Sequence, residues 1–190
     1  MPPKVKITKE EIIKTTLELV QKRGTDAINA RTIAAKLNCS TQPIFSNFES
    51  MEDLQQTVIL AAYDHYLGFI KSEVESGKYP QYKSFGMAYV RFAKDEKELF
   101  KLLFMRDRSE EDTSLLSSDF EESVQMLMQV NGVTRETAML MHLETWTCVH
   151  GIGTMLATSF LSLDSDLISN MLTDVYQGIR ARHLSKEEQQ

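Results

Sequence analysis

The chain has 190 residues, a net charge of −6, an apolar share of 42% and a charged share of 25%, values that exclude a wholly disordered protein. Eight Gly and four Pro are few for this length, which disfavours a turn-rich all-β protein and indicates long helices. Two cysteines, Cys39 and Cys148, cannot form a disulfide framework and are typical of a reducing cytoplasm. We interpret the uncharged run 145–163 as a buried helix and expect no membrane span, because the run carries His150 and several Thr and Ser residues.

Positive charge is concentrated at the start of the chain. Residues 1–48 hold eight Lys or Arg and four acidic residues, whereas the rest of the sequence has an excess of acidic residues. A basic segment of this kind is typical of a region that binds a polyanion, but ordinary solvated helix faces give the same pattern. Charge alone leaves both interpretations open.

The first helix has clear start and stop signals. Thr8 and Glu11 match a capping box, in which each side chain accepts a hydrogen bond from the other residue's backbone N–H. Apolar residues then recur at helical spacing until Gly24, a residue type that commonly ends helices. The pattern predicts a helix over residues 9–23.

Two further short helices are predicted with three residues between them, which is the spacing of a helix-turn-helix. Asn29 is the expected N-cap of the first, and Asn38 lies in the turn, where one residue must take a positive φ that asparagine tolerates well. Ser40 is the expected N-cap of the second helix, which puts Pro43 in its first turn. Such a helix suits the major groove of DNA, although two packed short helices without a DNA role share the spacing.

Helices also account for the rest of the sequence, so the predicted fold class is all-α with about nine helices in total. Ser50 is the expected cap of the first long helix, which has acidic residues in its first turn. The long helices are predicted near residues 51–75, 81–94, 96–105, 116–131, 135–161 and 165–184.

The segment around the helix-turn-helix resembles the N-terminal DNA-binding domain of TetR-type transcriptional regulators. The likeness is carried by Ile33-Ala34-Ala35-Lys36-Leu37-Asn38-Cys39-Ser40 and by Ile44-Phe45-Ser46-Asn47-Phe48-Glu49-Ser50-Met51-Glu52-Asp53-Leu54, after the leading helix and the basic arm Lys4-Val5-Lys6. Residues 98–104 resemble the family's sixth helix. The run from Trp146 to Gly151 resembles a tryptophan-histidine-glycine signature in the C-terminal domain of some members.

This sequence departs from the family's common pattern at four positions of the DNA-binding segment. Where the family often has glycine, tyrosine, histidine and lysine, the chain has Gln42, Phe45, Asn47 and Met51. Phe45 lacks the hydroxyl that would bond a phosphate, and the third helix has no Lys or Arg. We expect base contacts from Thr41 and Gln42. The full set of expected DNA-binding residues is Lys4, Lys6, Arg31, Ser40, Thr41, Gln42, Phe45, Ser46 and Asn47.

The resemblance implies a two-domain device. Residues 1–50 would form the DNA-binding domain, and residues 51–190 would bind an effector and form a dimer. The chain would then be a repressor that binds a palindromic operator in double-stranded DNA as a homodimer and responds to a small, largely apolar molecule. Expected effector contacts are Phe85, Tyr89, Phe104, Met126, Trp146 and His150, and expected dimer contacts are Gly153, Leu156, Met171, Val175 and Ile179.

Other function classes find less support in the sequence. We find no nucleophile–base pair, so an enzyme is not expected and no cofactor is implied. His142 and His150 are eight residues apart and have no Cys or Asp pair near them, so a metal site is not expected either. A thiol-based redox sensor that uses Cys39, in the turn before the third helix, remains the alternative.

Overall fold

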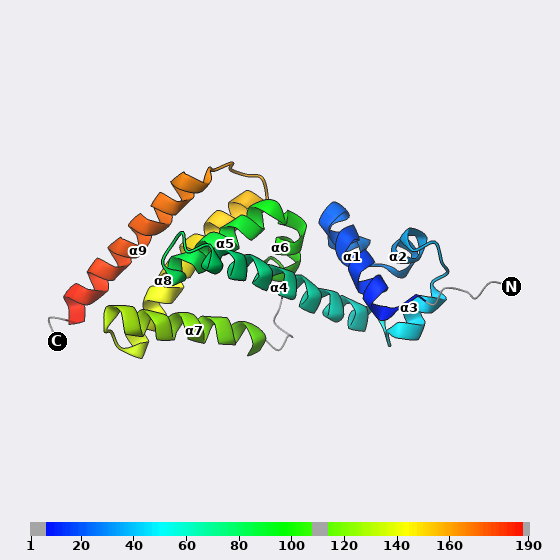
Figure 1. Cartoon of the computed structure of the whole chain (residues 1–190), viewed down its shortest axis with the longest axis horizontal. Helices are drawn as coiled ribbons and strands as arrows, with labels where there is room; N and C mark the ends of the chain where they lie inside the picture. Colours follow the sequence, from blue (N-terminus) through cyan, green and yellow to red (C-terminus); the bar gives the residue numbers. More distant parts are fainter. Residues whose placement is uncertain (1–6, 108–113, 188–190) are drawn as a thin grey trace. The chain divides into compact units, whose positions relative to one another are not determined.

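The computed structural model describes residues 7–107 and 114–187. Within these residues the regular secondary structure is entirely helical, which confirms the all-α prediction (Figure 1). The helices are α1 (Lys9–Arg23), the 3-10 turn η1 (Thr25–Ala27), α2 (Ala30–Lys36), α3 (Gln42–Asn47), α4 (Met51–Glu75), α5 (Gln81–Asp95), α6 (Lys97–Phe104), α7 (Ser114–Asn131), α8 (Arg135–Ala157) and α9 (Ser165–Glu187).

The chain forms two compact units. The first contains the described residues up to Gly68 together with Glu96–Arg106, and the second contains Phe69–Asp95 and the described residues after Arg106. The first unit therefore holds α1, α2, α3 and α6, the second holds α5, α7, α8 and α9, and α4 contributes to both. The functional division expected at residue 50 is a separate question and stays a prediction.

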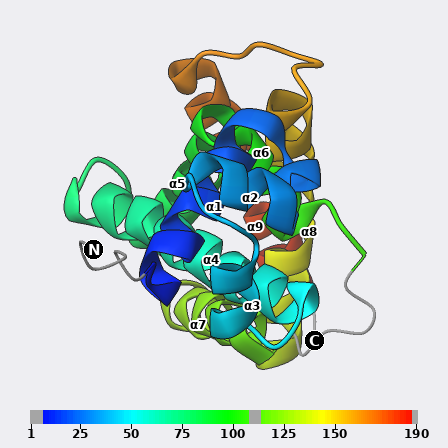
Figure 2. The ribbon, with the colours of Figure 1, turned by 90° about the vertical axis from the view of Figure 1, so that its right-hand side faces the viewer.

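In the first unit, α1, α2 and α3 pack around one apolar core (Figure 2). Ile12, Ile33, Ile44 and Leu54 come from four different helices, and none of them has any exposed surface. Each is the inward residue of an amphipathic helix, so their burial fixes which side of α3 faces outward.

The predicted capping signals act at the start of the chain. The Thr8 N–H donates to Glu11 Oε2 at 2.9 Å and the Glu11 N–H donates to Thr8 Oγ1 at 3.2 Å, which completes the capping box. Asn29 caps α2 by accepting from the Thr32 N–H at 2.9 Å. Gly24 ends α1 with a φ of 74°.

The structure confirms the predicted turn of the helix-turn-helix, but the predicted N-cap of α3 is wrong. Asn38 has a φ of 52°, the left-handed conformation that the turn needs. Ser40 was the expected N-cap, but Thr41 occupies that position and makes no capping bond with its side chain. A cap at Ser40 would bond the N–H three residues later, and that residue is Pro43, which has no N–H.

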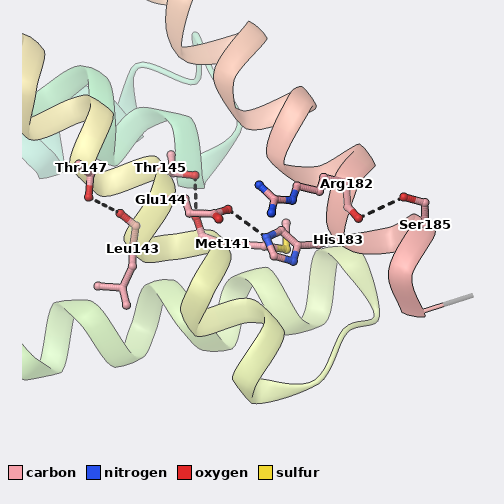
Figure 3. A network of polar contacts seen from close by, with 8 residues as sticks. All are labelled: Met141, Leu143, Glu144, Thr145, Thr147, Arg182, His183 and Ser185. Carbon is pink, nitrogen blue, oxygen red and sulfur yellow. Dashed lines mark hydrogen bonds and ion pairs between the residues drawn. The ribbon is translucent and has the colours of Figure 1, made fainter. Parts of the chain in front are cut away.

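In the second unit, α8 packs against α5, α7 and α9. A polar contact joins α8 to α9, where His183 Nε2 lies 2.9 Å from Glu144 Oε2 (Figure 3). Between α5 and α8, the Tyr82 hydroxyl lies 3.0 Å from Nδ1 of His142. These contacts fix how α8 is turned about its axis, and this determines which of its side chains are exposed.

Helix α8 ends four residues before the predicted boundary, at Ala157. The Phe160 N–H donates to the Met155 carbonyl at 2.9 Å, and Ser159 has a φ of 58° and donates its N–H to the Leu156 carbonyl at 3.0 Å. This is a Schellman motif built without glycine. The prediction of a buried helix through residue 163 is therefore wrong at its end, where Phe160 is 75% exposed. Among the helices that the structure describes, none has the length and apolar character needed to cross a membrane.

Candidate functional site

Helix α3 presents a mixed polar and apolar surface on its outer side. Ile44 is buried, and this turns Gln42 and Phe45 toward solvent while Thr41, at the N-terminus, is half-buried. Phe45 is 55% exposed, so its ring is available for contact at this surface. The amide of Gln42 can bond the edge of a base, and the ring of Phe45 can contact a thymine methyl group.

Two of the expected DNA contacts already donate their side-chain hydrogen bonds to backbone carbonyls within the first unit. Ser46 Oγ donates to the Gln42 carbonyl at 2.8 Å. Asn47 Nδ2 donates to the Pro43 carbonyl at 2.7 Å and to the Ile7 carbonyl at 3.5 Å. A DNA phosphate accepts hydrogen bonds, so these side chains have little to offer it. We assign Asn47 a positioning role, because it ties α3 to the segment before α1.

Two of the remaining expected DNA contacts are exposed. Arg31, in the first turn of α2, and Ser40, before α3, are both exposed. Lys4 and Lys6 lie outside the described residues.

A second cluster lies in the second unit, where Tyr89, Trp146 and His150 come together from α5 and α8. The Tyr89 hydroxyl lies 2.7 Å from His150 Nδ1. The Trp146 and His150 rings are stacked, with centroids 5.0 Å apart and planes inclined by 19°. Burial lowers the pKa of His150, which favours its neutral ring. Because Trp146 is 44% exposed, its indole presents a flat apolar surface next to a polar pair.

Three other expected effector contacts have different surroundings. Phe85 is on α5, one turn before Tyr89, and Met126 is on α7; both are half-buried. The ring of Phe104 belongs to the first unit, where its centroid is 5.3 Å from that of Tyr66.

The expected dimer residues divide into two groups. Gly153 and Leu156 are buried within this single chain, so they cannot supply surface to a partner subunit. Met171, Val175 and Ile179 on α9 are half-buried. Apolar side chains that are exposed on the same two helices are Leu140, Leu143 and Trp146 on α8 and Leu167 on α9.

One feature that the sequence interpretation missed is the burial of His142, which is 9% exposed. Its ring lies against the edge of Phe120, with centroids 4.7 Å apart, and burial lowers its pKa to about 4. His142 recurs on the same side of α8 as the buried Ala138 and Thr145, and this spacing is the signal that could have identified it. In the part of the chain that the structure describes, no group of three or more His, Cys, Asp or Glu side chains is arranged to hold a metal ion.

Comparisons with known proteins agree with this architecture. Residues 82–176, half of the chain, match the family described as "Tetracyclin repressor-like, C-terminal domain". The chain is 23% identical over 121 residues to the uncharacterized HTH-type transcriptional regulator YvkB of Bacillus subtilis strain 168. That match covers 64% of this chain and 64% of the relative, somewhat less than two thirds of its length.

Two solved structures have the same fold. A TetR-like transcriptional regulator from Rhodococcus sp. RHA1 superposes with a TM-score of 0.67 at 12% identity, over 89% of this chain and 93% of that chain. Apo ActR from Streptomyces coelicolor superposes with a TM-score of 0.53 at 16% identity, over 96% of this chain and 99% of that one. These comparisons do not confirm the tryptophan-histidine-glycine subtype. With the helix-turn-helix in place before a C-terminal domain whose match spans half of the sequence, the chain belongs to the TetR family of transcriptional regulators.

Proposed function

We propose that the protein is a sequence-specific DNA-binding transcriptional regulator, a repressor that binds a palindromic operator as a homodimer and responds to a small, largely apolar effector. The observation that carries the proposal is the outer surface of α3, where Gln42 and Phe45 are exposed while Ile44 is buried. A short helix held in this way can enter the major groove with its N-terminal residues against the bases. A bacterial cytoplasm, where DNA and regulator meet, is the expected compartment.

Base readout in this proposal comes from Thr41, Gln42 and Phe45. The Gln42 amide can form two hydrogen bonds with an adenine, while Thr41 and Phe45 can make apolar contact with thymine methyl groups. Arg31 and Ser40 then contribute phosphate contacts, together with the arm residues Lys4 and Lys6. This arrangement predicts A·T pairs within each half-site.

The dimer in this proposal uses the exposed apolar side chains of α8 and α9. Leu140 and Leu143 on α8, and Leu167, Met171 and Val175 on α9, lie outside the core or at its edge. Apolar side chains exposed on two neighbouring helices favour burial against a partner. A two-fold axis through these helices would let the same surface serve both subunits and would present two copies of α3 to a palindrome.

Binding to DNA is tested by selection from random duplexes with the purified full chain. The expected result is an inverted repeat whose half-sites are about 10 base pairs apart, or a multiple of that distance. Sedimentation of the free protein should give twice the mass of the chain at micromolar concentration. Recovery of no preferred sequence, or a folded monomer in sedimentation, would contradict the corresponding part of the proposal.

Effector binding is proposed at the Tyr89–Trp146–His150 cluster. Trp146 is the sole tryptophan of the sequence, so intrinsic fluorescence reports directly on this site. A screen of apolar compounds would identify those that dissociate the protein from its operator. These compounds should also change the fluorescence emission of Trp146. We expect Tyr89→Phe to weaken their binding about 5- to 10-fold, because the variant loses one hydrogen bond worth about 1 kcal/mol to the site. Tyr82→Phe, which removes the hydroxyl that lies 3.0 Å from His142 Nδ1 outside this cluster, is the matched control.

The alternative of thiol-based sensing through Cys39 receives no support from the comparisons. Both Cys39 and Cys148 are half-buried free thiols. Burial raises the pKa of Cys148, which disfavours its reactive thiolate form.

A further inference from the structure

An open groove lies between α1 and α2 in the first unit. Its volume is about 460 Å³, and it is lined by Leu19, Arg23, Arg31, Thr32, Ala35 and Lys36. Helix α1 contributes the first two of these residues and α2 contributes the other four. The groove therefore follows the seam between two helices of the helix-turn-helix domain.

Three cationic side chains surround this groove without a carboxylate among its lining residues. Arg23, Arg31 and Lys36 are all exposed, and within the described residues none of them forms an ion pair or a side-chain hydrogen bond. The carboxylate of α6 that approaches Gly24, Glu98, is already paired with Lys101 at 2.6 Å. No ion pair among the described residues therefore neutralises these three charges.

The groove shares Arg31 with the set of expected DNA-binding residues. Arg31 lies in the first turn of α2, and Lys36 lies at the other end of the same helix. Helix α3 itself has no Lys or Arg, so the reading surface needs its phosphate contacts from neighbouring elements.

We propose that the α1–α2 groove binds the phosphate backbone of DNA outside the half-site that α3 reads, and that Arg23 and Lys36 contact the phosphates. This proposal rests on the proposed function. Guanidinium groups bind phosphate oxygens in pairs, and lysine acts as a point charge. The hydroxyl of Thr32 can donate a further hydrogen bond to the same phosphates. Such contacts carry no sequence information, but they fix the protein on the duplex and add to affinity.

The test compares the double variant Arg23→Gln/Lys36→Gln with Lys14→Gln/Lys22→Gln, which removes the same charge from exposed positions of α1 that do not line the groove. Operator affinity is measured between about 50 and 200 mM salt on a minimal operator and on the same operator extended by about ten base pairs at each end. On the extended duplex, the groove variant should lower the slope of log affinity against log salt by about 3 to 4 per dimer. The control should leave this slope unchanged, and both variants should keep the preferred sequence.

Equal slopes for the groove variant and its control would overturn the proposal. A separate titration with pyrophosphate, followed through the amide signals of Thr32 and Ala35, tests whether a free phosphorylated compound occupies the groove instead. Tight pyrophosphate binding with an unchanged DNA slope would also overturn the assignment to DNA. If the wild-type protein selects no operator at all, it is the proposed function that fails.

Discussion

Lowering the pH from 7 to 5 is expected to destabilise the second unit through His142. This imidazole is 9% exposed, lies against the edge of Phe120, and has the Tyr82 hydroxyl 3.0 Å from its Nδ1. Burial disfavours the charged ring and lowers its pKa to about 4. A neutral ring can accept the hydroxyl's hydrogen bond at Nδ1, whereas a protonated ring cannot.

The size of the effect follows from proton linkage. The unfolded chain has a histidine pKa of about 6.5, so below that pH it binds a proton that the folded state refuses. Stability from this group is complete above about pH 6.5 and falls as the pH approaches 4, by about 3 kcal/mol in total. Between pH 7 and pH 5 the same relation gives a loss of about 2 kcal/mol.

Urea unfolding followed by helical circular dichroism at pH 7 and pH 5 measures this loss. Other groups titrate in the same range, so the informative quantity is the difference between the wild type and His142→Gln. The glutamine cannot titrate and can still accept a hydrogen bond from the Tyr82 hydroxyl. Between pH 7 and pH 5, the variant should therefore lose about 2 kcal/mol less unfolding free energy than the wild type does. Tyr82→Phe keeps the buried imidazole and should keep the pH dependence. The same loss in His142→Gln as in the wild type would refute the reasoning.

Two further predictions concern the helix-turn-helix. Gln42→Ala, on the exposed side of α3, should cost about 1 to 3 kcal/mol of operator binding without changing the urea midpoint. Ile44→Ala on the buried side should instead cost about 2 to 5 kcal/mol of folding stability. A loss of stability in Gln42→Ala, or no loss in Ile44→Ala, would contradict the assigned orientation of α3. Asn38→Val should cost about 1 to 2 kcal/mol because Asn38 has a φ of 52°. Asn38→Gly should cost nothing in the same unfolding assay, and equal midpoints for the two variants would contradict a left-handed turn.

The sequence predicted the parts of the fold that depend on local chemistry. The capping box at Thr8, the end of α1 at Gly24 and the left-handed Asn38 follow from interactions between residues close in sequence, and the structure confirms all three. The Ser40 cap is also a local matter, and the prediction failed there because it did not take into account the missing N–H of Pro43.

What could not be predicted depends on contacts between distant elements. Gly153 and Leu156 lie on an apolar stripe that suits either a monomer core or a dimer interface, and only packing against neighbouring helices shows that they are buried. The pairing of Tyr89 with His150 depends on the register between α5 and α8. The early end of α8 depends on a Schellman motif at Ser159 that has no glycine to announce it.

The central claim is that two copies of α3 read a palindromic operator, and interference footprinting on the selected operator tests it most directly. Modification of base edges in the major groove should block binding at two symmetric patches, each about one α-helix wide and about 10 base pairs from the other or a multiple of that distance. Within each patch, Gln42→Ala should remove the interference at one base pair and leave the rest unchanged. A single asymmetric patch, or a pattern that Gln42→Ala does not alter, would contradict the account.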